Sequence, residues 1–310
     1  MNFLSVLSQV IILFAIMFLG YYLRVKTLIN EESITNYSRL IFYVTMPAMI
    51  LSAMSKSHNI LIHEVMDVII VAIISYTFLF IMAFVMPKIV RVANDYVGLY
   101  RFMAMFGNVG FIGYPMLLAI LGEEALFIGS VFNIPYNLLL YTVGIYFITF
   151  DADQARKLDL SYKQFVNPGL MATVIGLILF FLHIQLPKII VDGTTMLGNI
   201  TTPLSMIVIG GSLYDAKISN ILSKHKILIY CVLKMIIFPL LLAVILTSIG
   251  ITGMTRGVAV ILCSMPIAAN TVIISKEYKG HVTEASEAVF ISTLFLILST
   301  PIIMLIINGL

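Results

Sequence analysis

The sequence predicts an all-α polytopic membrane protein, and three observations support this prediction. Of the 310 residues, 61% are hydrophobic and only 11% are charged, with a mean hydropathy of +1.07, whereas about a quarter of a soluble domain is charged. The apolar residues fall into segments of about 20 residues, the length that a membrane-spanning helix needs. Basic residues alternate between the two predicted sides. A soluble domain is thereby excluded, and the small, dispersed net charge of +3 argues against a nucleic-acid partner.

Ten apolar segments are predicted to span the bilayer, with short polar connections between them. The longest connection divides them into a first five-helix repeat in residues 1–150, a cytoplasmic link in 151–168 and a second five-helix repeat in 169–310. The first apolar run lacks a basic leader and a small-residue cleavage signal, so we expect it to remain as a helix. The ten predicted spans are residues 4–23, 37–55, 66–86, 98–120, 126–149, 169–186, 195–214, 227–249, 255–275 and 287–307.

The basic residues near the span ends predict the orientation of the chain. With the N-terminus outside, fourteen Lys and Arg residues fall on the cytoplasmic side and three on the external side. This bias follows the positive-inside rule. We therefore expect a multi-pass protein of the cell membrane with both termini outside.

Three weak sequence matches occur in the same order in both halves, which predicts an internal repeat. Because each half contains an odd number of spans, the second copy enters the membrane from the opposite side. Inverted repeats of this kind underlie many secondary transporters, whose discontinuous helices meet near the midplane. The matched pairs are Thr45-Met-Pro47 with Thr201-Thr-Pro203, Pro115 with Pro266, and Glu124–Ile128 with Glu287–Ile291.

The fourth and ninth spans contain residues that weaken a helix. The fourth contains the run Asn108, Gly110, Gly113 and Pro115, and the ninth contains Pro266 followed four residues later by Asn270. Glycine adds backbone freedom and proline removes a hydrogen-bond donor. We expect helix 4 to break around Pro115 and helix 9 around Met265-Pro266, and the two broken helices to cross. The helix that follows each break offers free N–H groups to an anion such as a carboxylate. The alternative is that the breaks are packing kinks whose asparagines cap freed backbone groups.

The residues around the two breaks resemble the auxin efflux carrier family, which includes plant PIN-type carriers and bacterial permeases of malate and related acids. The resemblance rests on Gly107-Asn-Val-Gly-Phe-Ile-Gly-Tyr-Pro115 and Met265-Pro-Ile-Ala-Ala-Asn-Thr-Val272, and it extends to the number of spans and the repeat. It implies the fold of the bile-acid sodium symporters, with a scaffold of helices 1, 2, 6 and 7 and a transport domain of helices 3–5 and 8–10. It also implies elevator-type alternating access and a homodimer formed through the scaffold.

The same resemblance assigns roles to individual residues. Asn108 matches the substrate-contacting asparagine of the family, and Pro115 and Pro266 match its crossover prolines. The long hydrophilic central loop of the plant carriers is missing from this sequence, so control by phosphorylation of that loop is not implied.

Other polar residues in the spans are further candidates for the site. Lys234 is either an anion counter-charge or a side chain that extends to the interface. Asn133 and Asn137 either line the site or join helices, and Ser205 is a candidate for facing the pocket. We expect the Thr-x-Pro motifs at Thr45 and Thr201 to kink helices rather than to bind substrate.

We therefore predict a secondary transporter of a small organic anion, such as a malate-like or auxin-like acid, that works by efflux or exchange. No cofactor or metal is expected, and sodium coupling stays open because backbone carbonyls at the breaks suit Na⁺. A sodium-coupled symporter of another solute is the alternative, and an ion channel is a weaker one. The sequence contains no catalytic motif that would indicate an enzyme. It also contains no soluble output domain of the kind that a sensor would carry.

Overall fold

The computed structural model describes residues 3–57, 60–150, 167–214, 224–278 and 280–309. These residues are almost entirely helical and contain no β-strand. Most of the predicted cytoplasmic link lies outside the described residues. The chain forms two compact units. Unit 1 comprises Met1–Ile69, Gly110–Phe132 and Val166–Lys217, and unit 2 comprises Ile70–Val109, Asn133–Phe165 and Ile218–Leu310.

The prediction of a polytopic membrane protein is confirmed at the level of fold class. Within the described residues, seven helical runs are long and apolar enough to cross a membrane. Three shorter apolar helices lie in the predicted fourth, sixth and ninth spans, at Val109–Leu121, Pro168–Phe181 and Gly253–Cys263. The inverted repeat, the orientation of the termini and the division into scaffold and transport domains stay predictions.

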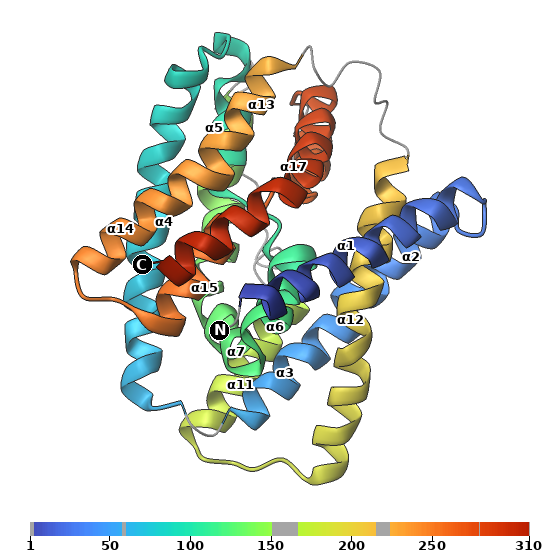
Figure 1. The fold of residues 1–310 in the computed structure, drawn as a ribbon, viewed down its shortest axis with the longest axis vertical. Helices are drawn as coiled ribbons and strands as arrows, with labels where there is room; N and C mark the ends of the chain where they lie inside the picture. Colours follow the sequence, from blue (N-terminus) through green and yellow to red (C-terminus); the bar gives the residue numbers. More distant parts are fainter. Residues whose placement is uncertain (1–2, 58–59, 151–166, 215–223, 279, 310) are drawn as a thin grey trace. The chain divides into compact units, whose positions relative to one another are not determined.

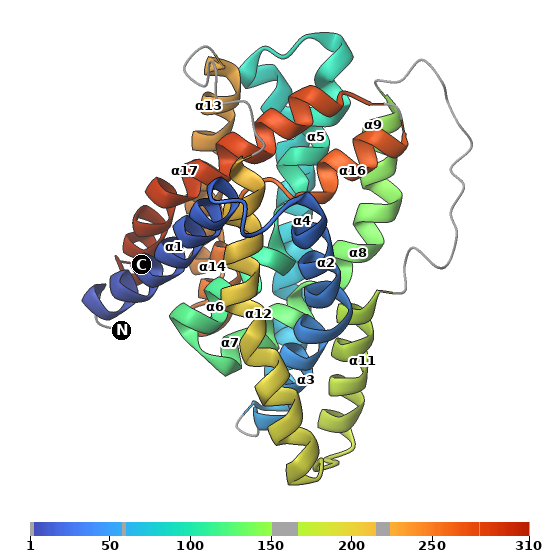
Figure 2. The ribbon, with the colours of Figure 1, turned by 90° about the vertical axis from the view of Figure 1, so that its right-hand side faces the viewer.

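Unit 1 is built around close contacts between helix backbones. A Cβ atom on Gly20 of α1 would meet the carbonyl oxygen of Ile207 in α12, and one on Gly210 would meet that of Met17. Small residues allow this approach, which is how membrane helices commonly pack. Helices α3 and α11 complete this group (Figures 1 and 2). The elements of unit 1 are α1 Phe3–Val25, α2 Glu31–Leu40, η1 Ile41–Thr45, α3 Met46–Lys56, the first turns of α4 Ile62–Val90, most of η3 Val109–Gly113, α6 Tyr114–Leu121, α7 Glu123–Phe132, α11 Pro168–Phe181 and α12 Lys188–Tyr214.

Helix α17 packs against the other helices in the C-terminal part of unit 2. It contacts α13, α14, α15 and α16 (Figure 1). Helix α4 joins through aromatic rings, because Phe78 lies 6.2 Å from Phe238 and Phe80 stacks on Phe147 at 6.1 Å. The elements of unit 2 are the remainder of α4, η2 Asn94–Tyr96, α5 Val97–Met105, α8 Ile134–Leu139, η4 Leu140–Gly144, α9 Ile145–Phe150, α13 His225–Val232, η6 Leu233–Ile237, α14 Phe238–Ser248, α15 Gly253–Cys263, α16 Asn270–Glu277 and α17 Val282–Gly309.

Three of the π-helical turns precede a proline. Pro47, Pro115 and Pro239 each follow the end of such a turn by two residues, after η1, η3 and η6. Proline donates no backbone hydrogen bond and its ring crowds the carbonyl one turn earlier, and a widened turn relieves that conflict. These prolines therefore lie in continuous helices.

Candidate functional site

The helix breaks lie in the two spans where they were predicted. Helix α5 ends at Met105 and η3 begins at Val109, so Phe106–Asn108 lie outside the helix. Helix α15 ends at Cys263 and α16 begins at Asn270. Each gap leaves backbone groups without their usual partners in the helix.

The two breaks meet in unit 2 through an antiparallel bridge between Gly107 and Ile267. A Cβ atom on Gly107 would lie 3.2 Å from both the Cβ and the carbonyl oxygen of Met265, so the close approach favours glycine. The bridge supplies partners for backbone groups that a break at membrane depth would leave unpaired. Its two hydrogen bonds run from the Asn108 N–H to the Pro266 carbonyl (2.7 Å) and from the Ala268 N–H to the Phe106 carbonyl (3.3 Å).

Side chains from two other helices complete the bonding of this bridge. The hydroxyl of Tyr136 in α8 donates to the Gly107 carbonyl at 3.0 Å. The hydroxyl of Ser292 in α17 accepts from the Ile267 N–H at 3.1 Å. The ring of Tyr136 also lies 5.5 Å from that of Phe106, edge to face. The crossing is thus held by side chains as well as by backbone.

The predicted position of the first break was wrong by several residues. It was expected around Pro115, but Pro115 lies in the first turn of α6, directly after a π-helical turn that contains Gly110 and Gly113. The widened turn accommodates the proline, so the helix continues there. Gly110 does not lie against a crossing backbone. A Cβ atom added to it would lie 3.1 Å from the methyl group of Met46, a flexible side chain. Gly107 is the glycine at the crossing.

Four predicted asparagines lie in unit 2, in different environments. Asn108 follows the bridge and is 8% exposed. Asn270 is the exposed first residue of α16, and its side chain makes no hydrogen bond to the described residues. Asn133 accepts a long hydrogen bond of 3.5 Å from the Tyr76 hydroxyl, and Asn137 is half-buried in α8. Asn270 is the one among them that is open to a ligand at the start of a helix.

Lys234 is a buried cation in unit 2. It lies in the η6 turn, is 1% exposed, and directs its ammonium at the Ala104 carbonyl, 3.4 Å away. Ala104 is in the last turn of α5, where carbonyls lack helical donors and the helix dipole is negative. No carboxylate pairs with Lys234 among the described residues. The ammonium therefore lies near the crossing with donors to spare.

A separate charged group lies where α17 begins. The Tyr100 hydroxyl donates to Glu284 at 2.9 Å, and Lys224 pairs with Glu287 at 2.6 Å. The hydrogen bond to Glu287 raises the pKa of Lys224, which keeps its ammonium charged. Both carboxylates thus have partners at the end of a span.

The remaining predicted residues belong to unit 1. Gly110, Gly113 and Pro115 lie in η3 and α6, and Ser205 is fully buried in α12. A cavity of about 460 Å³ in this unit lies between the end of α3 and the end of α11, with His63 and His183 in its lining. None of the predicted site residues lines that cavity.

The chemistry of the crossing suits binding rather than catalysis. Asparagine amides, the start of a helix and one buried ammonium offer hydrogen-bond donors and positive potential. No group of three or more His, Cys, Asp or Glu side chains that could hold a metal occurs in the described residues.

These features define a multi-pass helical membrane protein with a paired helix break. The family model for membrane transport proteins matches residues 5–304. The chain therefore belongs to the membrane transport protein family, which confirms the predicted resemblance to auxin efflux carriers at family level. It is a membrane transporter.

Two archaeal relatives match along nearly the whole chain. An uncharacterized transporter of Methanocaldococcus jannaschii is 26% identical over 304 residues, which cover 94% of this chain and 96% of the relative. An uncharacterized transporter of Methanothermobacter thermautotrophicus is 23% identical over 305 residues, covering 97% and 98%. Neither name specifies a substrate.

Two residues that hold the crossing were not predicted. Tyr136 lies between the predicted Asn133 and Asn137, and no sequence motif around it indicated a role. Ser292 directly follows the repeated segment Glu287–Ile291, which is the one local signal that could have pointed to it. Both act on backbone groups far away in the sequence.

We predict that Ser292→Ala destabilises the protein by about 1–3 kcal/mol, because the buried Ile267 N–H loses its acceptor. The measurement is thermal unfolding of the purified protein in detergent. Ser286→Ala is the matched control, since Ser286 is an exposed serine of the same helix that bonds only its own turn. Equal melting temperatures for Ser292→Ala and the wild type would contradict this role for Ser292.

Proposed function

We propose that this transporter carries small organic anions, of the malate-like or auxin-like class, by elevator-type alternating access. The carboxylate binds beside the crossing of the two broken helices, and transport runs as efflux or exchange across the cell membrane. The protein works as a homodimer joined through its scaffold helices, as the family resemblance implies. Both termini lie outside, in agreement with the distribution of basic residues.

One observation supports the anion proposal above all others. The bridge between Gly107 and Ile267 brings Asn108 close to the segment that leads into α16. That segment ends at Asn270, whose exposed amide stands where a helix starts. A carboxylate there would accept hydrogen bonds from side-chain amides at the positive end of the helix, whose Thr271 and Val272 N–H groups already bond the Ala268 and Ala269 carbonyls. No desolvated carboxylate of the protein has to be displaced.

Lys234 gives this site its charge. A buried ammonium is costly in a membrane unless something compensates it. The end of α5 compensates part of this cost through the Ala104 carbonyl. A substrate anion would compensate the rest, so anion binding and burial of Lys234 favour each other.

The proposed driving force is the membrane potential. A negative cell interior expels anions, and each elementary charge that crosses the whole field gains about 2.3 kcal/mol per 100 mV. Outward transport of an anion therefore needs no coupling ion. The elevator assignment rests on the family resemblance and on the paired break, which fixes two half-helices to each other and favours movement of the site as one body.

Asn108→Ala is expected to lower the rate of malate and indole-3-acetate transport at least tenfold in proteoliposomes, because the site loses a donor beside the bridge. Asn270→Ala is expected to act in the same direction. Asn36→Ala, on the exposed face of α2, serves as the control. Unchanged uptake of every transported acid by both Asn108→Ala and Asn270→Ala would refute the site.

Lys234→Met is expected to make exchange of a monoanion sensitive to voltage. In the wild type, Lys234 and one bound indole-3-acetate sum to zero charge, so the loaded site crosses the field without electrical work. The methionine variant leaves the bound anion uncompensated. The measurement is the rate of indole-3-acetate self-exchange with and without a potassium–valinomycin potential.

Lys276→Met, at an exposed lysine of α16, is the control for this charge change. Elution of Lys234→Met as a single folded species in size-exclusion chromatography separates loss of charge from loss of fold. Voltage-independent exchange by a folded Lys234→Met variant would exclude Lys234 as the counter-charge.

A further inference from the structure

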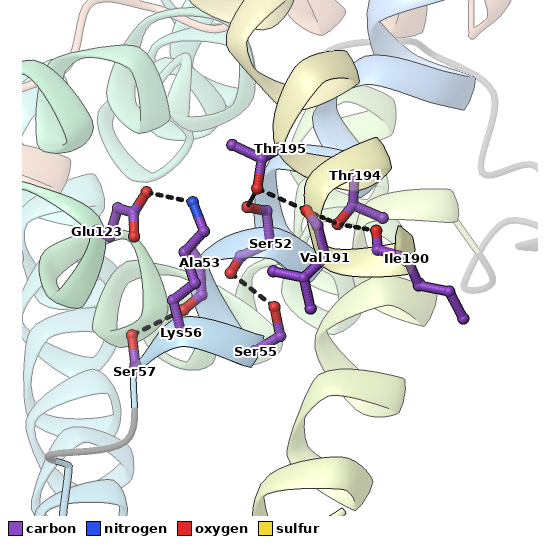
Figure 3. Close-up of polar contacts among 10 residues, drawn as sticks. All are labelled: Ser52, Ala53, Ser55, Lys56, Ser57, Glu123, Ile190, Val191, Thr194 and Thr195. Carbon is purple, nitrogen blue, oxygen red and sulfur yellow. Dashed lines mark hydrogen bonds and ion pairs between the residues drawn. The ribbon is translucent and has the colours of Figure 1, made fainter. Parts of the chain in front are cut away.

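Two groups of hydroxyls lie on α12 and on the helix formed by η1 and α3, and only one group is hydrogen-bonded. Near the end of α3, the hydroxyls of Ser52 and Thr195 bond each other at 2.8 Å, and Thr195 also donates to the Val191 carbonyl (Figure 3). Four hydroxyls farther along the same two helices have no hydrogen-bond partner in the described residues. They belong to Thr45, Thr201, Thr202 and Ser205.

Serine and threonine in a helix normally bond the carbonyl one turn earlier. Other residues of α12 do so, because Thr194 donates to the Ile190 carbonyl at 2.9 Å and Ser212 to the Val208 carbonyl at 2.8 Å. The four unpartnered hydroxyls depart from this behaviour within a single stretch of the helix pair. Each buried hydroxyl left unpaired costs about 1–3 kcal/mol. A ligand that pairs with several such hydroxyls in one place would therefore stabilise the protein.

The register of the two helices brings these hydroxyls into two successive turns of the helix pair. Thr195 is bonded to Ser52, and a Cβ atom on Gly198 would lie 2.7 Å from the Met49 Cα. From the first contact to the second, the residue number increases along α12 and decreases along α3, so the two helices are antiparallel. Continuing by one turn places Thr45 beside the Thr201–Thr202 pair. Ser205 follows one turn later on the same face as Thr201.

Three of these side chains are almost completely buried. Thr45 is 1% exposed, and Thr201 and Ser205 are each 0% exposed. Thr202 is half-buried. Bulk water cannot solvate the three buried hydroxyls.

Two prolines lie beside these hydroxyls, and Pro203 frees a carbonyl oxygen. Pro47 follows Thr45 by two residues, and Pro203 directly follows Thr202. Because proline has no N–H, the carbonyl one turn before it loses its helical donor. For Pro203 this is the Asn199 carbonyl. Before Pro47 the η1 turn is π-helical, so the Met46 N–H bonds the carbonyl five residues earlier, that of Ile41.

The oxygen atoms at this place indicate the class of ligand. They are neutral hydroxyl and carbonyl oxygens, with no carboxylate and no basic side chain among the four residues. Hard cations take oxygen ligands, and Ca²⁺ and Mg²⁺ usually require carboxylates. Backbone carbonyls coordinate Na⁺ in many transporters, so neutral oxygens are suitable ligands for a monovalent cation. We propose that Thr45, Thr201, Thr202 and Ser205 form a binding site for an alkali cation, Na⁺ in the first place, in unit 1.

This cation site consists of other residues than the proposed anion site. It gives a binding role to the two Thr-x-Pro motifs, which the sequence predicts only to kink helices. Binding of a cation to the folded protein alone raises stability with the logarithm of its concentration. The cation is therefore detectable without any knowledge of the transported solute.

The experiment is thermal unfolding of the full-length protein in detergent at constant ionic strength, with Na⁺, K⁺ or Li⁺ exchanged against N-methylglucamine. We expect a saturable rise in melting temperature with Na⁺ and a smaller one with at least one of the other ions. In the double variant Thr201→Val/Ser205→Ala, we expect the apparent Kd for Na⁺ to rise at least tenfold. Thr194→Val, which removes a partnered hydroxyl of the same helix, should keep the wild-type response.

Three results would overturn the proposal. The first is a wild-type melting temperature indifferent to all three ions, which means that the hydroxyls hold water only. The second is an unchanged Na⁺ response in Thr201→Val/Ser205→Ala. The third is an equal loss of response in Thr194→Val. If the double variant does not fold, the wild-type titration together with Thr45→Val still decides the question. The Asn108→Ala variant should retain the full Na⁺ response, which separates this site from the anion site.

Discussion

Every backbone N–H and C=O group inside a bilayer needs a partner, and a break in a membrane helix leaves several without one. In this protein each of the two breaks supplies hydrogen-bond partners to the backbone of the other. The Asn108 N–H and the Pro266 carbonyl are joined at 2.7 Å, and the remaining edges of the bridge are closed by Tyr136 and Ser292. The break in each helix is therefore stable only because the other helix is broken at the matching place.

This mutual dependence also prepares the site for a ligand. A helix start that is held by a bridge keeps its positive dipole end in place before any substrate arrives. Preorganised donors lose little entropy on binding. The asparagines beside the bridge and the ammonium of Lys234 at the end of α5 extend the same principle to side chains. The proposed anion site is thus a consequence of how the backbone is satisfied.

Prolines in the other helices meet the same constraint in a different way. After η1, η3 and η6, a π-helical turn widens the helix and the chain continues through Pro47, Pro115 and Pro239. Near Pro266 the chain leaves the helix instead. Proline alone therefore does not produce a break, since Pro87, Pro203 and Pro301 also lie inside continuous helices. At Pro266 a second broken backbone is present and forms the bridge.

Sequence reasoning succeeded where the signal is local and failed where it is distant. Apolar runs of sufficient length predicted the helical segments, and dilution by Gly, Asn and Pro predicted which spans are interrupted. The break was placed at Pro115 rather than at Gly107, because proline is the stronger local signal and the bridge that decides the matter comes from residue 267. Ser292, Tyr136 and the unpartnered hydroxyl of Thr45 could not be predicted, since each depends on a contact, or the lack of one, across the fold.

The most direct test of the central claim is ligand protection of a cysteine at the crossing. Ala269 is exposed beside Asn270, and the native Cys231 and Cys263 are both buried, so Ala269→Cys offers a single reactive thiol. The measurement is the rate of maleimide labelling with increasing malate or indole-3-acetate. The account predicts a saturable slowing by each acid that is transported, and loss of that slowing when Asn108→Ala is added. Labelling that stays equally fast at saturating concentrations of a transported acid would contradict it.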